Sequence, residues 1–190
     1  MLREVLRQDM TKSEIEQFLK DKGDYVQIDH LGRFIKEPIA MDTKKFVFLK
    51  LAELYEKAKM LNEAAKMYNN VADLSISFVE KIKYHIKEAE LYVKVGAFER
   101  VEQAMKRAFS NANSKEREEV QASVKQFLKA QAGLLEKEAK RNQAIKFYEK
   151  LLEMRILETE RQEIREKLLE LYRRTGKLHE AMTLEKSLGK

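Results

Sequence analysis

The sequence contains no cysteine and no tryptophan, and it has one proline and six glycines among its 190 residues. The lack of cysteine excludes disulfide bonds and thiolate-bound metal sites. So few prolines and glycines leave little material for the tight turns of a sheet protein. No apolar run approaches the roughly 20 residues that a membrane-spanning helix requires. The composition therefore favours an all-α protein without a membrane span.

The amino-terminal stretch MLREVLRQDM gives no sign of a secretory signal. Charged residues interrupt its apolar positions, and no small-residue cleavage pattern follows. We therefore expect a cytoplasmic protein. The abundance of lysine and glutamate, together with the lack of cysteine, would also suit a thermophilic source.

A pattern of two short amphipathic helices recurs along the chain. In most copies the first helix carries a small residue and then a tyrosine, and the second helix carries an alanine where the two helices would cross. The departures are Leu169 for the small residue, Leu135 for the tyrosine and Val101 for the alanine. Four copies are visible: ELYEKAKMLNEAAKMY, ELYVKVGAFERVEQAM, GLLEKEAKRNQAIKFY and ELYRRTGKLHEAMTLE. A polar corner at residues 59–63 separates the helices of the first of these copies. A fainter copy surrounds Leu19, so the pattern predicts about five helical pairs.

These units resemble tetratricopeptide repeats, which are helix-turn-helix repeats of about 34 residues. The small slot of the first helix holds Ala52, Ala89 and Ala132, and the crossing slot holds Ala64, Ala144 and Ala181. The resemblance implies an α-solenoid of antiparallel hairpins wound into a right-handed superhelix. We expect one continuous domain, in which residues 41–190 form the array and residues 1–40 form a divergent helical unit. The repeats of the array would occupy about 45–75, 78–110, 114–154 and 160–188.

Two segments depart from the regular pattern. Apolar residues continue at helical spacing from about residue 114 to 140, with Asn113 or Ser114 as the N-cap, which predicts one unusually long helix. The other segment, residues 24–37, can be interpreted as a β-hairpin because it contains good strand formers. We prefer a helix, since Ile28, Leu31 and Ile35 keep the helical period.

Nothing in the sequence indicates catalysis or a cofactor. The histidines His30, His85 and His179 lie in different repeats without a partner motif, and we expect His85 to fill a packing position. No zinc-binding HExxH, glycine-rich phosphate loop or aspartate-rich calcium loop occurs. The sequence therefore predicts a protein that is not an enzyme and binds no metal or cofactor.

Binding is the better hypothesis, because tetratricopeptide arrays hold partners in a groove lined by their first helices. Carried over position by position, the resemblance places charged residues of mixed sign in this groove: Lys83, Lys87, Glu90, Lys94, Lys129, Lys137, Glu170, Arg173 and Arg174. This implies a protein-interaction scaffold. The alternative for each side chain is that it only faces solvent.

A second hypothesis starts from charge. The net charge is +6, and the chain becomes more basic towards its carboxyl end, where Lys137, Lys140 and Arg141 form a basic patch. Such a patch favours phosphate contact, so a ribosome- or RNA-associated factor remains open. The basic half lacks aromatic residues that are free to stack on bases, and this favours the scaffold.

The last predicted helix suggests self-association. Leu178, Met182, Leu184 and Leu188 offer more apolar surface than one packed helix face requires. A homodimer formed by two such ends would cover this surface with a closed two-fold interface.

Overall fold

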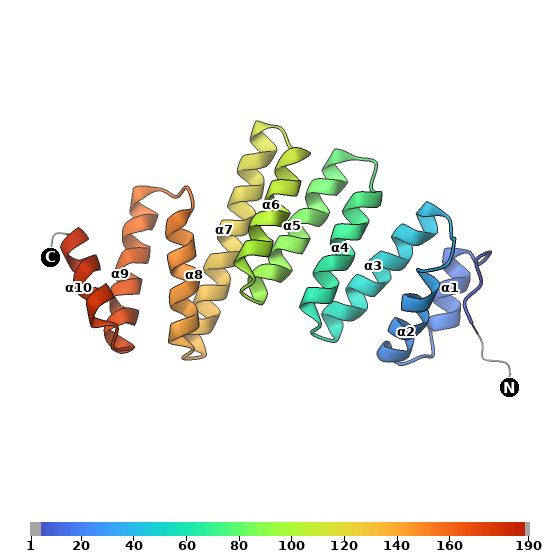
Figure 1. Ribbon diagram of the computed structural model, residues 1–190, viewed down its shortest axis with the longest axis horizontal. Coiled ribbons are helices and arrows are strands. Elements are labelled where there is room, and N and C mark those ends of the chain that lie inside the picture. The colour runs from blue at the N-terminus through green and yellow to red at the C-terminus, as the bar shows by residue number, and fades with distance from the viewer. Residues whose placement is uncertain (1–4, 189–190) are drawn as a thin grey trace. The chain divides into compact units, whose positions relative to one another are not determined.

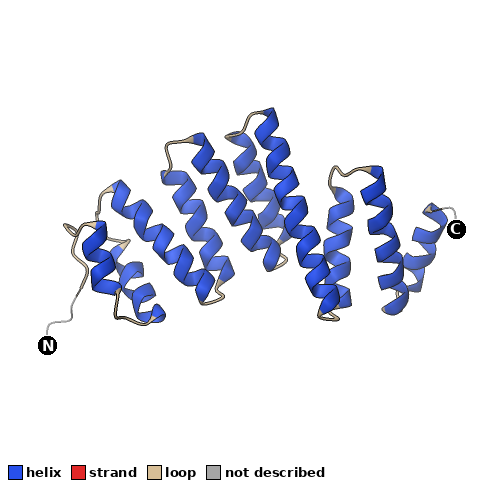
Figure 2. Ribbon diagram, turned by 180° about the vertical axis from the view of Figure 1, so that it is seen from behind, coloured by secondary structure: helices blue, strands red, loops and turns tan. Residues whose placement is uncertain are grey.

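The computed structural model describes residues 5–188, and within this range the chain forms ten α-helices and no β-strand (Figures 1 and 2). The prediction of an all-α protein is confirmed. The helices are α1 (Lys12–Leu19), α2 (Asp24–Phe34), α3 (Met41–Lys57), α4 (Leu61–Leu74), α5 (Phe78–Lys94), α6 (Phe98–Ser110), α7 (Ser114–Lys137), α8 (Arg141–Glu153), α9 (Glu158–Arg174) and α10 (Leu178–Ser187).

The chain divides into two compact units, the first ending at Val120 and the second beginning at Gln121. Helices α1 to α6 and the first turns of α7 belong to the first unit. The remainder of α7 and helices α8 to α10 belong to the second. In the first unit α2 packs on α3, α3 on α4, α4 on α5 and α5 on α6, and in the second unit α8 packs on α9 and α9 on α10.

The first unit has its core between these neighbouring helices. One apolar cluster joins α1, α2 and α3 and consists of Ile15, Leu19, Leu31, Phe34, Val47 and Leu51. Alanines fill the closest approaches of α3 to α6, and Ala52, Ala64, Ala89 and Ala104 have at most 1% of their surface exposed. Small side chains let the helix backbones approach closely.

The second unit also buries its small slots, two of which, Ala132 and Ala144, are equivalent to Ala52 and Ala64. Ala132, Ala144 and Ala181 are buried, and so are Tyr148 and Tyr172. The burial that the sequence predicts for the small slots is therefore confirmed in both units. Larger side chains complete this core: Val124, Leu128, Leu135, Ile145, Phe147, Leu151, Ile164, Leu168, Leu169 and Leu171.

Four short turns share one backbone geometry. After α3, the N–H of Met60 donates to the carbonyl of Tyr55 at 2.8 Å, and Lys59 between them has a positive φ of 61°. Equivalent bonds run from Ala97 to Tyr92, from Lys140 to Leu135 and from Lys177 to Tyr172. The positive-φ positions of these three turns are Gly96, Ala139 and Gly176. This is the Schellman closure of a helix end, which needs a left-handed residue.

The structure decides the open points of local structure. Residues 24–34 are helical, so the preferred helix is confirmed and the β-hairpin is excluded. The long helix is α7, with 24 residues. Asn113 caps it: its side-chain oxygen accepts from the N–H of Glu116 at 3.0 Å, and its own N–H donates to the Glu116 carboxylate at 2.8 Å.

The predicted corner at residues 59–63 is wrong in its extent. The connection comprises only residues 58–60, and α4 begins at Leu61. The polar residues Asn62 and Glu63 belong to the first turn of the helix, where a carboxylate near the N-terminus is favourable.

Candidate interaction surface

A network of polar and ionic contacts joins α3, α4 and α5 of the first unit. The hydroxyl of Tyr68 on α4 donates to the carboxylate of Glu56 on α3 at 2.7 Å. Lys87 on α5 reaches the same carboxylate at 3.5 Å and also contacts Glu90 at 3.1 Å. Glu90 also forms an ion pair with Lys94, at 2.6 Å. Three successive helices are thus linked through Glu56.

The electrostatics of this network follow from its partial burial. Burial and the Glu56 carboxylate both raise the pKa of Tyr68 well above its ordinary value. Burial alone would lower the pKa of Lys87, but its bonds to Glu90 and Glu56 outweigh this and raise it. Burial likewise opposes ionisation of Glu90, and the two lysines nevertheless hold its pKa below the ordinary range. These groups therefore stay in one protonation state near neutral pH.

The second unit repeats the network 80 positions later in the sequence. Glu136 on α7, Tyr148 on α8 and Lys167 on α9 correspond to Glu56, Tyr68 and Lys87. Lys167 lies 3.7 Å from the Glu136 carboxylate and donates to the Tyr148 hydroxyl at 3.3 Å. We call each of these three-residue sets a cross-brace.

Other contacts recur with the same spacing. The ion pair of Lys45 with Glu80 in the first unit has its counterpart in Lys125 and Glu160 in the second. The helical pair Lys94–Glu90 likewise corresponds to Arg174–Glu170. This repetition is an internal duplication of sequence and of local structure. The 80-residue spacing is visible in the sequence and matches the residues of the two cross-braces, but it does not show that they touch.

Glu160 is the most strongly shifted carboxylate in this set. Lys129 contacts it at 2.6 Å and Lys125 at 3.0 Å, joining α7 to α9. These two lysines, in that order of effect, lower the pKa of Glu160 to about 2. It is therefore fully ionised at neutral pH.

The predicted groove residues fall on three helices, and most of them are already paired. Lys83, Lys87, Glu90 and Lys94 lie on α5, Lys129 and Lys137 on α7, and Glu170, Arg173 and Arg174 on α9. Arg173 pairs with Glu185, and Lys87, Glu90, Lys94, Lys129, Glu170 and Arg174 pair as described above. Among residues 5–188, Lys83 and Lys137 have no carboxylate within ion-pair distance. Three of the paired residues, Lys87, Lys129 and Arg173, connect different helices. The others, Glu90, Lys94, Glu170 and Arg174, pair within one helix.

The basic patch lies at the turn between α7 and α8. Lys137, Lys140 and Arg141 are all exposed there, and Lys140 pairs with Glu138 at 2.8 Å. The predicted self-association residues lie on α10 or at its end. Leu178 and Met182 are 65% and 58% exposed, whereas Leu184 and Leu188 are half-buried.

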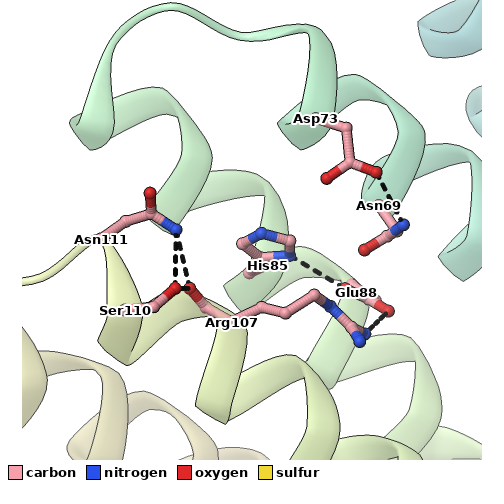
Figure 3. A network of polar contacts seen from close by, with 7 residues as sticks. All are labelled: Asn69, Asp73, His85, Glu88, Arg107, Ser110 and Asn111. Atoms are coloured by element: carbon pink, nitrogen blue, oxygen red, sulfur yellow. Dashed lines mark hydrogen bonds and ion pairs between the residues drawn. The ribbon is translucent and has the colours of Figure 1, made fainter.

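A buried polar network lies between α5 and α6 (Figure 3). The side chains of His85 and Arg107 both point toward Glu88, with His85 Nδ1 at 3.1 Å and the Arg107 guanidinium at 2.5 Å. Only 1% of the Glu88 surface is exposed. His85 is buried, as a packing residue should be, but the sequence did not predict its contact with Glu88 or the Arg107–Glu88 ion pair.

This buried network is absent from the corresponding place in the second unit. Positions 165, 168 and 187 there hold Arg165, Leu168 and Ser187, and Leu168 is buried. The fold therefore accepts an apolar residue where the first unit buries Glu88.

Exposed apolar residues gather at one corner of the first unit, which sequence reasoning also missed. Ile76, Phe78 and Val79, at the connection into α5, are 95%, 64% and 67% exposed. We call these three residues the apolar corner. Three apolar residues within four positions at a helix start are the sequence signal that could have found it.

Residues 5–188 contain no group of three or more acidic, histidine or cysteine side chains able to hold a metal ion. None of the described helices is both long and apolar enough to cross a membrane. Comparison with known proteins gives no family model and no curated protein that matches the sequence.

Proposed function

We propose that the protein is a non-enzymatic interaction scaffold of the tetratricopeptide type, acting in the cytoplasm. In this proposal its helices form antiparallel hairpins that stack into a right-handed solenoid. The support is internal: the Schellman turns recur, the crossing slots hold buried alanines, and the sequence repeats over 80 residues.

One observation carries the functional part of the proposal. The cross-brace Glu56–Tyr68–Lys87 connects α3, α4 and α5 in the first unit. The cross-brace Glu136–Tyr148–Lys167 connects α7, α8 and α9 at the equivalent positions of the second unit. A surface whose side chains are held in place before binding loses less entropy when a partner docks. A rigid helical face without catalytic groups is suited to holding another protein.

Affinity capture from the native organism, with and without nuclease, tests this proposal. We expect a discrete protein partner that crosslinks to the chain and is retained after nuclease treatment. A scaffold would also keep this partner when Lys137, Lys140 and Arg141 are replaced by glutamine.

The opposite result would assign the protein to RNA or the ribosome. Capture would then disappear with nuclease, fall steeply with salt and be lost in the Lys137→Gln, Lys140→Gln, Arg141→Gln variant. The matched control variant carries glutamine in place of Lys66, Lys106 and Lys146, which are exposed lysines on α4, α6 and α8. That variant removes the same charge from another place.

A further inference from the structure

The apolar corner is the most concentrated apolar exposure in the first unit. Ile76 projects from the connection after α4, and Phe78 and Val79 occupy the first two positions of α5. Single exposed apolar residues are ordinary on protein surfaces, whereas neighbouring ones mark interaction sites.

The duplication provides an internal control for this corner. At the equivalent start of α9, Phe78 and Val79 are replaced by Glu158 and Thr159. Both helix starts still make the same kind of ion pair. Glu80 of α5 contacts Lys45 of α3, and Glu160 of α9 contacts Lys125 of α7. Polar residues therefore build the same local structure, and the fold does not require the aromatic and aliphatic side chains of the corner.

The charge beside the corner is positive and uncompensated. Lys81 Nζ lies 5.9 Å from the centre of the Phe78 ring. Lys83 is exposed and lies one helical turn after Val79. Among the residues described, neither lysine has a carboxylate within ion-pair distance. The nearby acids have other partners: Glu80 pairs with Lys45, and Asp73 accepts a hydrogen bond from Asn69.

The second unit reverses this charge. Arg161, the counterpart of Lys81, pairs with Glu158 at 3.5 Å, and the counterpart of Lys83 is Glu163. The second unit thus has no apolar side chain in place of Phe78 or Val79 and no unpaired cation in place of Lys81 or Lys83. Its exposed apolar residue at this end is Leu157, which replaces Ser77 and is 69% exposed.

We propose that the apolar corner, with Lys81 and Lys83, is the docking site for a short protein segment in which two or three apolar side chains are flanked by aspartate or glutamate. The apolar residues would supply most of the affinity, and the lysines would select for acidic neighbours. Attachment of a basic surface to anionic lipid typically uses clusters of four to eight basic residues, so two lysines favour a protein segment. This proposal rests on the scaffold function and specifies one of its sites.

Selection from a phage-displayed library of random peptides tests the site. The full chain is the target, and the counter-target is the Phe78→Glu, Val79→Thr variant, which carries the residues that the second unit uses at these positions. We expect enriched peptides that combine apolar and acidic residues. Synthetic versions should bind the counter-target at least about tenfold more weakly, and Lys83→Glu should weaken them further.

A matched control is Met41→Glu, which also replaces an apolar residue, 63% exposed, at the first position of a helix. It should leave peptide binding unchanged. The site is wrong if no peptide is enriched, if the enriched peptides are basic, or if they bind both targets equally. Binding of the parent to phosphatidylserine vesicles that is lost in the variant would assign the corner to lipid and overturn the proposal. If the variant still captures the parent's native partner, the scaffold function stands and only this site fails.

Discussion

Glu88 shows what a single residue contributes to this structure. A carboxylate with 1% exposure is stable only because His85 and Arg107 contact it. A buried ionic group adds little net stability, but removal of one partner leaves the others unsatisfied. The duplicated position, Leu168, indicates that an apolar residue fits there.

These facts predict opposite outcomes for two variants. Glu88→Ala should lower the free energy of unfolding by about 2–3 kcal/mol, because it leaves a cavity and unpaired His85 and Arg107. The triple variant His85→Arg, Glu88→Leu, Arg107→Ser copies the second unit and should recover most of this loss. Urea denaturation measures both. A triple variant no more stable than Glu88→Ala would show that the two sites are not equivalent.

The left-handed turn residues give a second prediction. Gly96 and Gly176 adopt positive φ without strain, whereas Ala139 adopts φ 57° despite its Cβ. Ala139→Gly should therefore raise the free energy of unfolding by about 0.5–1 kcal/mol. Gly176→Ala should lower it by a similar amount, since no atom lies within 4 Å of the added Cβ and only the backbone is strained. Thermal unfolding checks both variants, and a stabilising Gly176→Ala would contradict this account.

At the scale of helices, the ion pairs between α7 and α9 make stability depend on pH. The pKa of Glu160 is about 2 in the folded chain, against an ordinary value of 4.5. The native state therefore binds fewer protons there, and the contribution of Glu160 is fully present above about pH 4.5 and is lost as the pH falls toward 2.

We expect the variant Lys125→Met, Lys129→Met to differ from the parent in the pH dependence of unfolding. Its stability should decline less between pH 4.5 and pH 2, because its Glu160 titrates nearer to the ordinary value. Denaturant titrations at several pH values measure this difference. As a control, Lys150→Met removes a lysine of the second unit that pairs with the more exposed Glu153. Equal pH profiles for the parent and the double variant would show that these pairs do not set the acid limit.

The helices were largely predictable from sequence, and their ionic contacts were not. Ala64 and Ala144 fall on apolar stripes, and Asn113 precedes Glu116 at the spacing of a capping box, so periodicity and local chemistry suffice. The bond between Arg107 and Glu88 joins different helices and depends on how those helices are rotated. Lys87 was predicted to face a partner. The structure instead shows it in contact with Glu90 on its own helix and with Glu56 on α3, and the second contact depends on how α3 and α5 are placed.

At the scale of the whole molecule, the exposed face of α10 bears on self-association. Leu178 and Met182 are exposed, and the predicted homodimer would cover them. We expect light scattering to report a dimer for the parent and a monomer for the Met182→Lys, Leu188→Lys variant. A matched variant replaces the exposed Ile76 with lysine and should remain dimeric. A monomeric parent, or a dimer in both variants, would show that this interface does not exist.

The duplication also bears on how the chain finds its fold. Helices α6 and α10 occupy equivalent places 80 residues apart in the sequence, so one of them can pair with the wrong partner helix while the chain folds, for example when α10 takes the place of α6. The buried Glu88 opposes this exchange, because α10 carries Ser187 where α6 carries Arg107, and the misplaced helix would leave the carboxylate without its cation. The Arg107–Glu88 ion pair adds little to final stability, but by this argument it favours the pairing of α6 with α5 over that of α10 with α5. Replacing it with the apolar residues of the second unit should therefore yield a protein that is stable once folded but refolds with additional slow, misassembled species.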